Sequence, residues 1–175
     1  MFVSGAGALP VPVGEFFANL GMRVQEGYGL SETSPLVTVN EFERQVYGTV
    51  GRVAPRQQVA IQDIETKKIL ALQTYDSFDA EYASEEGEIL VKGPNVMQGY
   101  WNRPEATAEV FDEEGWFHTG DGGSEGEYGF ITIADRKKDV IISGGENVSS
   151  IEVEDAVFSH AEVSEVAVIG VPDDK

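Results

Sequence analysis

The chain has 175 residues, of which 41% are hydrophobic, and this is enough to bury a core. Its formal net charge of −19 argues against nonspecific binding of nucleic acid, and the absence of cysteine excludes disulfides and thiolate metal sites. No apolar run approaches the length of a membrane span, and the first residues lack the features of a secretory signal. An anionic ligand would need local help from backbone amides, a few placed cations or Mg²⁺.

The N-terminal region combines short apolar runs with small residues. Residues 1–3 predict a strand, and residues 13–20 predict a short helix that ends at Gly21. Residues 22–25 alternate as a second strand. Small side chains between the first strand and the helix would let the backbone approach a flat ligand, and these are Gly5, Ala6, Gly7 and Ala8.

The segment EGYGLSETSP, residues 26–35, joins a glycine turn to hydroxyl and carboxylate side chains. It follows a predicted strand, and loops at the carboxyl ends of strands are where ligands bind in open α/β sheets. The alternative is the start of a capped helix with Ser31 as N-cap. Both interpretations are open from these residues alone.

Two runs in the middle of the chain, residues 46–53 and 57–64, predict the strands of a β meander, because their side chains alternate with a period of two. Residues 87–93 predict a third strand. The acidic and polar residues 73–86 predict an exposed excursion between strands. After the third run, an aromatic turn at residues 99–104 leads to a short predicted helix at residues 105–111.

Residues 115–123 predict a strand followed by a loop that carries one carboxylate, Asp121, among glycines. An aspartate that a ligand can approach closely suits acceptance of hydrogen bonds from the two hydroxyls of a ribose. An ordinary Asp-Gly turn is the alternative. We expect His118 to be packed or solvated beside Trp116 rather than catalytic.

Five consecutive charged residues, 135–139, separate the β-branched runs 131–133 and 140–142. Five adjacent charges cannot all lie in a core, so the segment is expected to be a solvated connector. It is either an ordinary hairpin loop or a hinge between two bodies. In the hinge interpretation, Arg136 and Lys138 are free to meet an anionic ligand.

The C-terminal residues predict a helix at 151–158, capped by Ser149 or Ser150, and a strand at 163–171. One β-α-β unit cannot cover both faces of its own sheet. We therefore expect this second body to be truncated.

Four motifs in fixed order resemble those of the adenylate-forming enzymes, which include acyl-CoA synthetases, firefly luciferase and the adenylation domains of peptide synthetases. The motifs are EGYGLSETSP, GEILVKGPNVMQGYWNRPEAT, WFHTGD and DRKKDVIISGGENV. The resemblance covers essentially the whole chain and implies an α+β fold. It divides the chain into a β-rich distorted barrel or meander of the large domain at residues 1–134, a hinge at 135–139, and the start of a truncated small α/β lid domain at 140–175.

The resemblance also implies an ATP or AMP site and a role for each matched residue. Tyr28 would stack on the adenine, Asp121 would accept both ribose hydroxyls, and Arg136 would also reach the ribose. Ser31, where the family more often has threonine, would contact the phosphate. The other implied positions are Glu32 as ligand of Mg²⁺, Lys138 as hinge pivot, Gly145 beside the pantetheine arm of CoA, and Gly5, Ala6, Gly7, Ala8 and Gly29 around the nucleotide.

The implied activity is that of an ATP-dependent carboxylate–CoA ligase, most like the long-chain fatty-acid ligases. The phosphate-clasping loop would precede Met1 and the catalytic lysine would follow Lys175, so the chain alone is expected to be inactive. The resemblance implies a cytoplasmic location and leaves peripheral membrane contact open. The alternatives are a ligase for an aryl or medium-chain acid, a non-catalytic AMP-binding or interaction module, and an acidic scaffold without a ligand.

Overall fold

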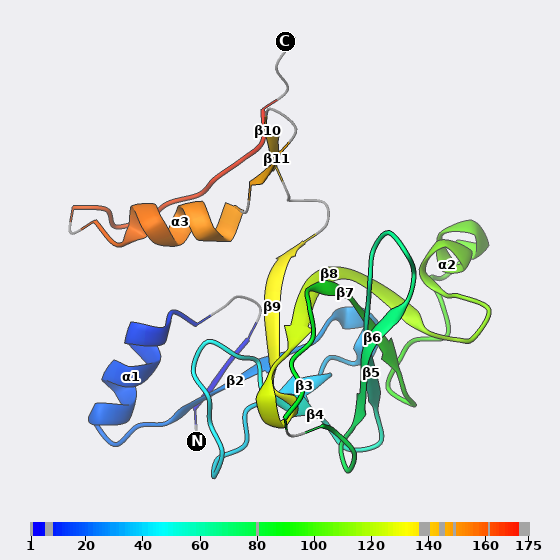
Figure 1. Ribbon diagram of the computed structural model, residues 1–175, viewed down its shortest axis with the longest axis horizontal. Helices are drawn as coiled ribbons and strands as arrows, with labels where there is room; N and C mark the ends of the chain where they lie inside the picture. The colour runs from blue at the N-terminus through cyan, green and yellow to red at the C-terminus, as the bar shows by residue number, and fades with distance from the viewer. Residues whose placement is uncertain are drawn as a thin grey trace.

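Most of the regular secondary structure is short strands, and the helices lie at the edges of the molecule (Figure 1). The computed structural model describes residues 2–5, 9–79, 81–136, 141–143, 146–148, 150–160 and 162–171. The helices are α1 (Val11–Asn19), α2 (Pro104–Val110) and α3 (Ser150–Phe158), with 3-10 turns at Ser31–Thr33 and Glu127–Gly129. The strands are β1 (Phe2–Ser4), β2 (Val24–Tyr28), β3 (Thr38–Val39), β4 (Arg52–Val53), β5 (Gln58–Gln62), β6 (Ile69–Thr74), β7 (Gly87–Lys92), β8 (Phe117–Glu125), β9 (Ile131–Arg136), β10 (Ile141–Ser143) and β11 (Glu146–Val148).

The strands form two sheets and a separate hairpin. The larger sheet is antiparallel and has the order β6-β5-β7-β8-β9. The smaller sheet has the order β1-β2-β3-β4, in which β1 and β2 are parallel and the other pairs antiparallel. Among the described residues, strands β10 and β11 pair only with each other, and they lie with α3 beyond the end of β9 (Figure 1). This architecture confirms the predicted α+β fold with a β-rich body.

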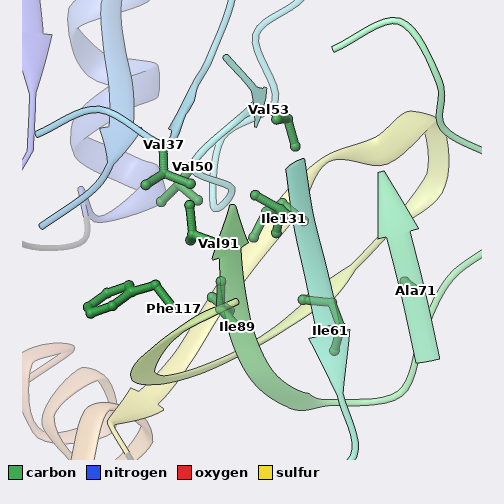
Figure 2. Close-up of a cluster of buried hydrophobic side chains, with 10 residues drawn as sticks. Val37, Val50, Val53, Ile61, Ala71, Ile89, Val91, Phe117 and Ile131 are labelled. Atoms are coloured by element: carbon green, nitrogen blue, oxygen red, sulfur yellow. The ribbon is translucent and has the colours of Figure 1, made fainter. Parts of the chain in front are cut away.

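The main core lies between one face of the larger sheet and three valines in or next to the smaller sheet, Val37, Val50 and Val53 (Figure 2). Ile89 and Val91 of β7 point to this face, whereas Leu90 between them packs with Ala60 and Trp116 in a second cluster. The strand is therefore apolar on both faces, as expected for a strand in the centre of a sheet. Each of the three β7 side chains is at most 1% exposed.

Two backbone hydrogen bonds join the sheets directly. The N–H of Val50 donates to the carbonyl of Ile131 at 2.8 Å, and the N–H of Ile131 donates to the carbonyl of Gly51 at 2.9 Å. Gly51 has φ +82°, and a Cβ there would lie 2.0 Å from the carbonyl carbon of Val39. Only glycine fits this position, so the junction depends on it.

The predicted strand at residues 46–53 is wrong over most of its length, because only Arg52–Val53 is a strand. The side chain of Asn40 instead forms hydrogen bonds with the backbone of residues in this segment. Its Nδ2 donates to the carbonyl of Thr49 at 2.6 Å, and its Oδ1 accepts from the N–H of Val46 at 3.1 Å. A buried side chain that bonds to backbone groups in this way replaces the ladder a strand would need.

The predicted glycine loop around Asp121 is also wrong, since β8 runs through this residue to Glu125. The strand is irregular there. Gly120 has φ +73°, and the pairing register with β9 shifts between Asp121 and Gly123. The alternating pattern was hidden by glycines, which pair in a ladder but weaken the sequence signal for a strand.

Two further boundaries differ from the sequence predictions. The excursion predicted to begin at Gln73 begins later, because Gln73 lies in β6 and is 2% exposed. The excursion also packs against the smaller sheet, since the guanidinium of Arg52 in β4 lies 3.8 Å from the centre of the Phe78 ring.

The strand predicted at residues 163–171 is not found, and the structure describes these residues as coil. Asp135 and Arg136 of the expected connector belong to β9, and residues 137–139 lie outside the described residues.

None of the described helices is long and apolar enough to serve as a membrane span.

Glu125 at the end of β8 is a buried carboxyl group whose charged form is disfavoured. It is 3% exposed, and burial, with a smaller effect of the charge on Asp79, raises its pKa from 4.5 to about 7. Between these values the folded protein keeps a proton that the unfolded chain releases. The free energy of unfolding should therefore fall as the pH rises through this window and become level above it.

We expect Glu125→Gln to remove this fall, because the amide stays neutral. The variant should be more stable than the unmodified chain by about 1–3 kcal/mol at pH 8, with little difference near pH 4.5. Urea unfolding at several pH values measures the effect. Glu127→Gln changes an exposed carboxylate in the same turn and should keep the original pH dependence. An unchanged pH dependence in Glu125→Gln would show that this carboxyl group is not its source.

Candidate functional site

A cavity of about 590 Å³ lies where three of the sequence motifs meet. One wall is the turn that follows β2, a second is β8, and a third comes from the aromatic turn and α2. The lining residues are Gly29, Leu30, Ser31, Glu32, Glu88, Tyr100, Glu109, Val110, Phe117, His118, Thr119, Gly120 and Asp121. The predicted positions Gly29, Ser31, Glu32 and Asp121 are therefore brought to one cavity.

Tyr28 and Asp121, which are 93 positions apart in the chain, meet beside this cavity. The phenol of Tyr28 donates a hydrogen bond to Oδ2 of Asp121 at 2.7 Å. Asp121 is 4% exposed and lies opposite Arg136 in the β8–β9 ladder. The backbones of all three residues predicted to surround a nucleoside thus converge, although the structure does not describe the side chain of Arg136.

Hydroxyl groups hold the backbone of β8 at the site. Oγ1 of Thr119 donates to the carbonyl of Ile89 at 2.7 Å and accepts from the N–H of Asp121 at 3.1 Å. The first bond ties β8 to β7, and the second fixes the backbone of Asp121. Together with the hydrogen bond from Tyr28 to the carboxylate, they hold both the backbone and the side chain of Asp121 in place. A carboxylate held in this way is already positioned to accept hydrogen bonds from a ligand.

The turn after Tyr28 is compact because of Gly29 and Thr33. A Cβ on Gly29 would lie 1.5 Å from the carbonyl oxygen of Pro35, so no other residue fits. Oγ1 of Thr33 accepts from the N–H of Leu30 at 3.0 Å. Leu30 is the N-cap of the 3-10 turn and Ser31 lies inside it, so the alternative in which Ser31 caps a helix is wrong. Ser31 is exposed on the cavity rim.

Glu32 is connected to the aromatic turn. Its Oε1 accepts a hydrogen bond from the phenol of Tyr100 at 2.8 Å. Burial, followed by this hydrogen bond and by the charge of Glu32, raises the pKa of Tyr100. Within the described part of the chain, no group of three or more His, Asp or Glu side chains could hold a metal ion. Glu32 would therefore supply one carboxylate to a cation whose remaining ligands are water molecules or the oxygens of a phosphate ligand.

The structure describes only some of the other predicted site positions. Gly5 directly follows β1, next to the backbone of Gly27 in β2. The backbone of Leu9 is held in place, because its N–H donates to Oε1 of the buried Glu26 at 2.7 Å. Five predicted site residues lie outside the described residues, namely Ala6, Gly7, Ala8, Lys138 and Gly145.

His118 is a cavity residue that the sequence prediction placed beside Trp116. Its Nδ1 lies 3.3 Å from Oε2 of Glu88, and its Nε2 lies 3.7 Å from Oδ2 of Asp112. Its position three residues before Asp121 was the only available sequence signal. The two carboxylates come from other segments, and Tyr100 likewise joins the site through a contact that spans 68 positions, so spacing could not reveal them.

The comparisons with known proteins agree with this site. The chain belongs to the family of AMP-binding enzymes, whose model matches residues 1–101. It is 45% identical over 173 residues to a long-chain-fatty-acid–CoA ligase of Bacillus subtilis and 40% identical over 176 residues to one of Salmonella typhimurium. Each alignment covers 98% of this chain and 29% of the ligase. The chain thus spans about 29% of the length of these relatives.

Solved structures give the same result. ATP-bound MatB from Rhodopseudomonas palustris is 38% identical, with a TM-score of 0.86, over 99% of this chain and 33% of that protein. The O-succinylbenzoate CoA synthetase of Bacillus subtilis, in complex with ATP and magnesium, is 34% identical, with a TM-score of 0.81, over 98% of this chain and 34% of that protein. These relatives confirm the predicted resemblance to acyl-CoA synthetases.

Proposed function

We propose that this chain carries the adenosine-binding part of an ATP-dependent carboxylate–CoA ligase. The longer enzyme would form an acyl-adenylate with release of pyrophosphate and then transfer the acyl group to CoA. The observation that supports this function best is the contact between Tyr28 and Asp121 beside a nucleotide-sized cavity. Membership in the AMP-binding enzyme family and the similarity to ATP- and AMP-bound ligases agree with it.

In this proposal, Asp121 accepts hydrogen bonds from the ribose hydroxyls. Its Oδ2 already accepts the phenol of Tyr28 at 2.7 Å, so the bond also fixes the tyrosine ring beside the carboxylate. The adenine would stack on that ring, a type of contact worth about 1–3 kcal/mol for nucleic-acid bases. Gly5 to Ala8 would border the other face of the base, and Arg136 would reach the ribose from β9.

The phosphates require cations, because the cavity is acidic. Its lining includes the carboxylates Glu32, Glu88, Glu109 and Asp121. Glu32 would hold Mg²⁺ together with phosphate oxygens, and Ser31 would donate to the phosphate. When bound, the ion offsets the negative charge of the phosphates. The residues of this chain contribute the adenosine contacts and one carboxylate for the cation.

The acid substrate is proposed to be a fatty acid. The similar curated proteins include long-chain-fatty-acid–CoA ligases from several bacteria. An aryl or medium-chain acid is the alternative, and one similar structure is named as an O-succinylbenzoate CoA synthetase. We further propose a cytoplasmic location, which matches the use of ATP and CoA.

Residues 135–139 are proposed to be a hinge between a large-domain part at 1–134 and a lid part at 140–175. Two observations support this division. The β8–β9 ladder ends with the pair of Asp121 and Arg136, and the hairpin of β10 and β11 pairs with neither sheet. CoA would then bind after the lid has turned, with Gly145 beside its pantetheine arm.

The adenosine contacts can be tested on the 175-residue chain by titration with AMP, followed by calorimetry or NMR. We expect saturation in the millimolar range or below, and its loss in both Asp121→Ala and Tyr28→Ala. Tyr28→Phe keeps the ring face but loses the hydrogen bond to Asp121, so it should bind AMP more weakly than the unmodified chain and more tightly than Tyr28→Ala. Circular dichroism shows whether each variant is folded. Equal AMP affinity in folded Asp121→Ala and the unmodified chain would contradict the proposed ribose contact.

The activity of the longer enzyme can be tested with a panel of carboxylic acids. We expect pyrophosphate release that depends on the acid and is highest with long-chain fatty acids. The panel should include medium-chain and aryl acids, which represent the alternative. Absence of acid-dependent release from the whole enzyme, while AMP binding persists, would favour a non-catalytic nucleotide-binding module.

The hinge can be tested in the longer enzyme with Lys138→Pro. Proline fixes φ near −65°, so lid rotation should be restricted. We expect thiol transfer to fall by more than adenylation, with the two half-reactions measured separately by acyl-CoA formation and pyrophosphate exchange. Lys138→Ala serves as the control for loss of charge. Equal losses in both half-reactions would contradict a hinge at this residue.

A further inference from the structure

The phenol of Tyr100 and the carboxylate of Glu32 form an isolated pair on the cavity wall. We propose that Tyr100 is a positioning residue that holds Glu32 so that one carboxylate oxygen is occupied and the other is presented to a divalent cation. The inference rests on the proposed function, in which Glu32 is the protein ligand of Mg²⁺. It adds a residue that does not touch the cation itself.

The contact uses only one oxygen of the carboxylate. The phenol donates to Oε1 at 2.8 Å, and among the described residues Oε2 accepts no hydrogen bond. A tyrosine carries a single O–H, so it cannot bridge both oxygens as an arginine does. The pair therefore favours a carboxylate that binds a cation through one oxygen.

The phenol of Tyr100 donates its O–H to a charged acceptor, the carboxylate of Glu32. A hydrogen bond from a neutral donor to a charged acceptor is stronger than one between neutral groups. Tyr100 is 37% exposed and lines the cavity with Glu32, so a solvated ion can reach the pair.

The backbone of Tyr100 is itself held in place. Its N–H donates to Oγ1 of Thr107 at 2.9 Å, and its carbonyl accepts from the N–H of Arg103 at 3.1 Å. Gly99 before it has φ +145°, and a Cβ there would lie 2.7 Å from Cγ2 of Thr107. The phenol is thus presented from a tight turn that is closed against the first turn of α2.

The same segment also holds the backbone around Glu32. The N–H of Met97 donates to the carbonyl of Glu32 at 2.7 Å, and Nδ2 of Asn95 donates to the carbonyl of Thr33 at 2.6 Å. Residues 95–100 therefore contact both the main chain and the side chain of the proposed ligand. A free glutamate side chain loses rotamer entropy when it is ordered, and this arrangement orders it before a cation binds.

The test uses the 175-residue chain, labelled with ¹⁵N and titrated with Mn²⁺. Paramagnetic broadening should appear at the amides of Thr33 and Met97 before it appears at amides beside exposed carboxylates such as Glu65. We expect Tyr100→Phe to need about tenfold more Mn²⁺ for the same broadening, a typical effect of removing a group that orients a metal ligand. Glu32→Gln should abolish the selective broadening.

Tyr128→Phe is the matched control. It removes the hydroxyl of an exposed tyrosine that has no hydrogen-bond partner among the described residues, and it should leave the Mn²⁺ dependence unchanged. A Tyr100→Phe variant with unchanged Mn²⁺ dependence would overturn the proposal, as would the absence of selective broadening in the unmodified chain. A purely structural role of Tyr100 predicts lower stability without this change in Mn²⁺ dependence.

Titration with AMP without metal separates this inference from the proposed function. Among the described residues, the phenol of Tyr100 forms its hydrogen bond with Glu32 and not with Tyr28 or Asp121. Tyr100→Phe should therefore keep the AMP affinity within about twofold. Normal AMP binding with Mn²⁺ dependence unaffected by Tyr100→Phe would overturn only the positioning role. Selective Mn²⁺ broadening that needs Tyr100, without AMP binding, would support that role and contradict the adenosine site.

Discussion

The hydrogen bond from Tyr28 to Asp121 connects the last residue of β2, in the smaller sheet, to β8 in the larger sheet. Asp121 is 4% exposed, and a buried carboxylate is stable only when other groups satisfy its charge. The site therefore requires the two sheets to dock correctly, which the bonds around Gly51 and Ile131 secure. The cavity wall therefore depends on the same docking of the two sheets as the junction does.

Threonine hydroxyls hold the segments that border the cavity. They bond to nearby backbone groups at Thr33 in the 3-10 turn, Thr107 in α2 and Thr119 in β8. Glycines complete the arrangement where a side chain would collide, as at Gly29. The polar groups at the cavity are thus positioned by hydrogen bonds to the backbone of these elements.

Electrostatics set a second constraint on the site. The chain carries a net charge of −19, and its cavity is lined by several carboxylates, so a nucleotide would meet mostly negative groups. Local cations would have to overcome this repulsion. Arg136, which lies opposite Asp121 in the ladder, and the cation proposed beside Glu32 would be two such sources.

The sequence by itself determined the strand-rich fold, the short helices and the family, because periodicity and the order of four motifs are local properties of the chain. It also selected Tyr28, Glu32 and Asp121, which the folded chain brings to one cavity or its edge. Only the tertiary structure decided that Asp121 lies in a bulged strand, that residues 46–51 are not a strand, and that Tyr100 and His118 join the site. The physical reason is that these features depend on hydrogen bonds and packing between distant segments, such as the contact across 68 positions between Tyr100 and Glu32. Such interactions compete with local propensity and leave no regular spacing in the sequence.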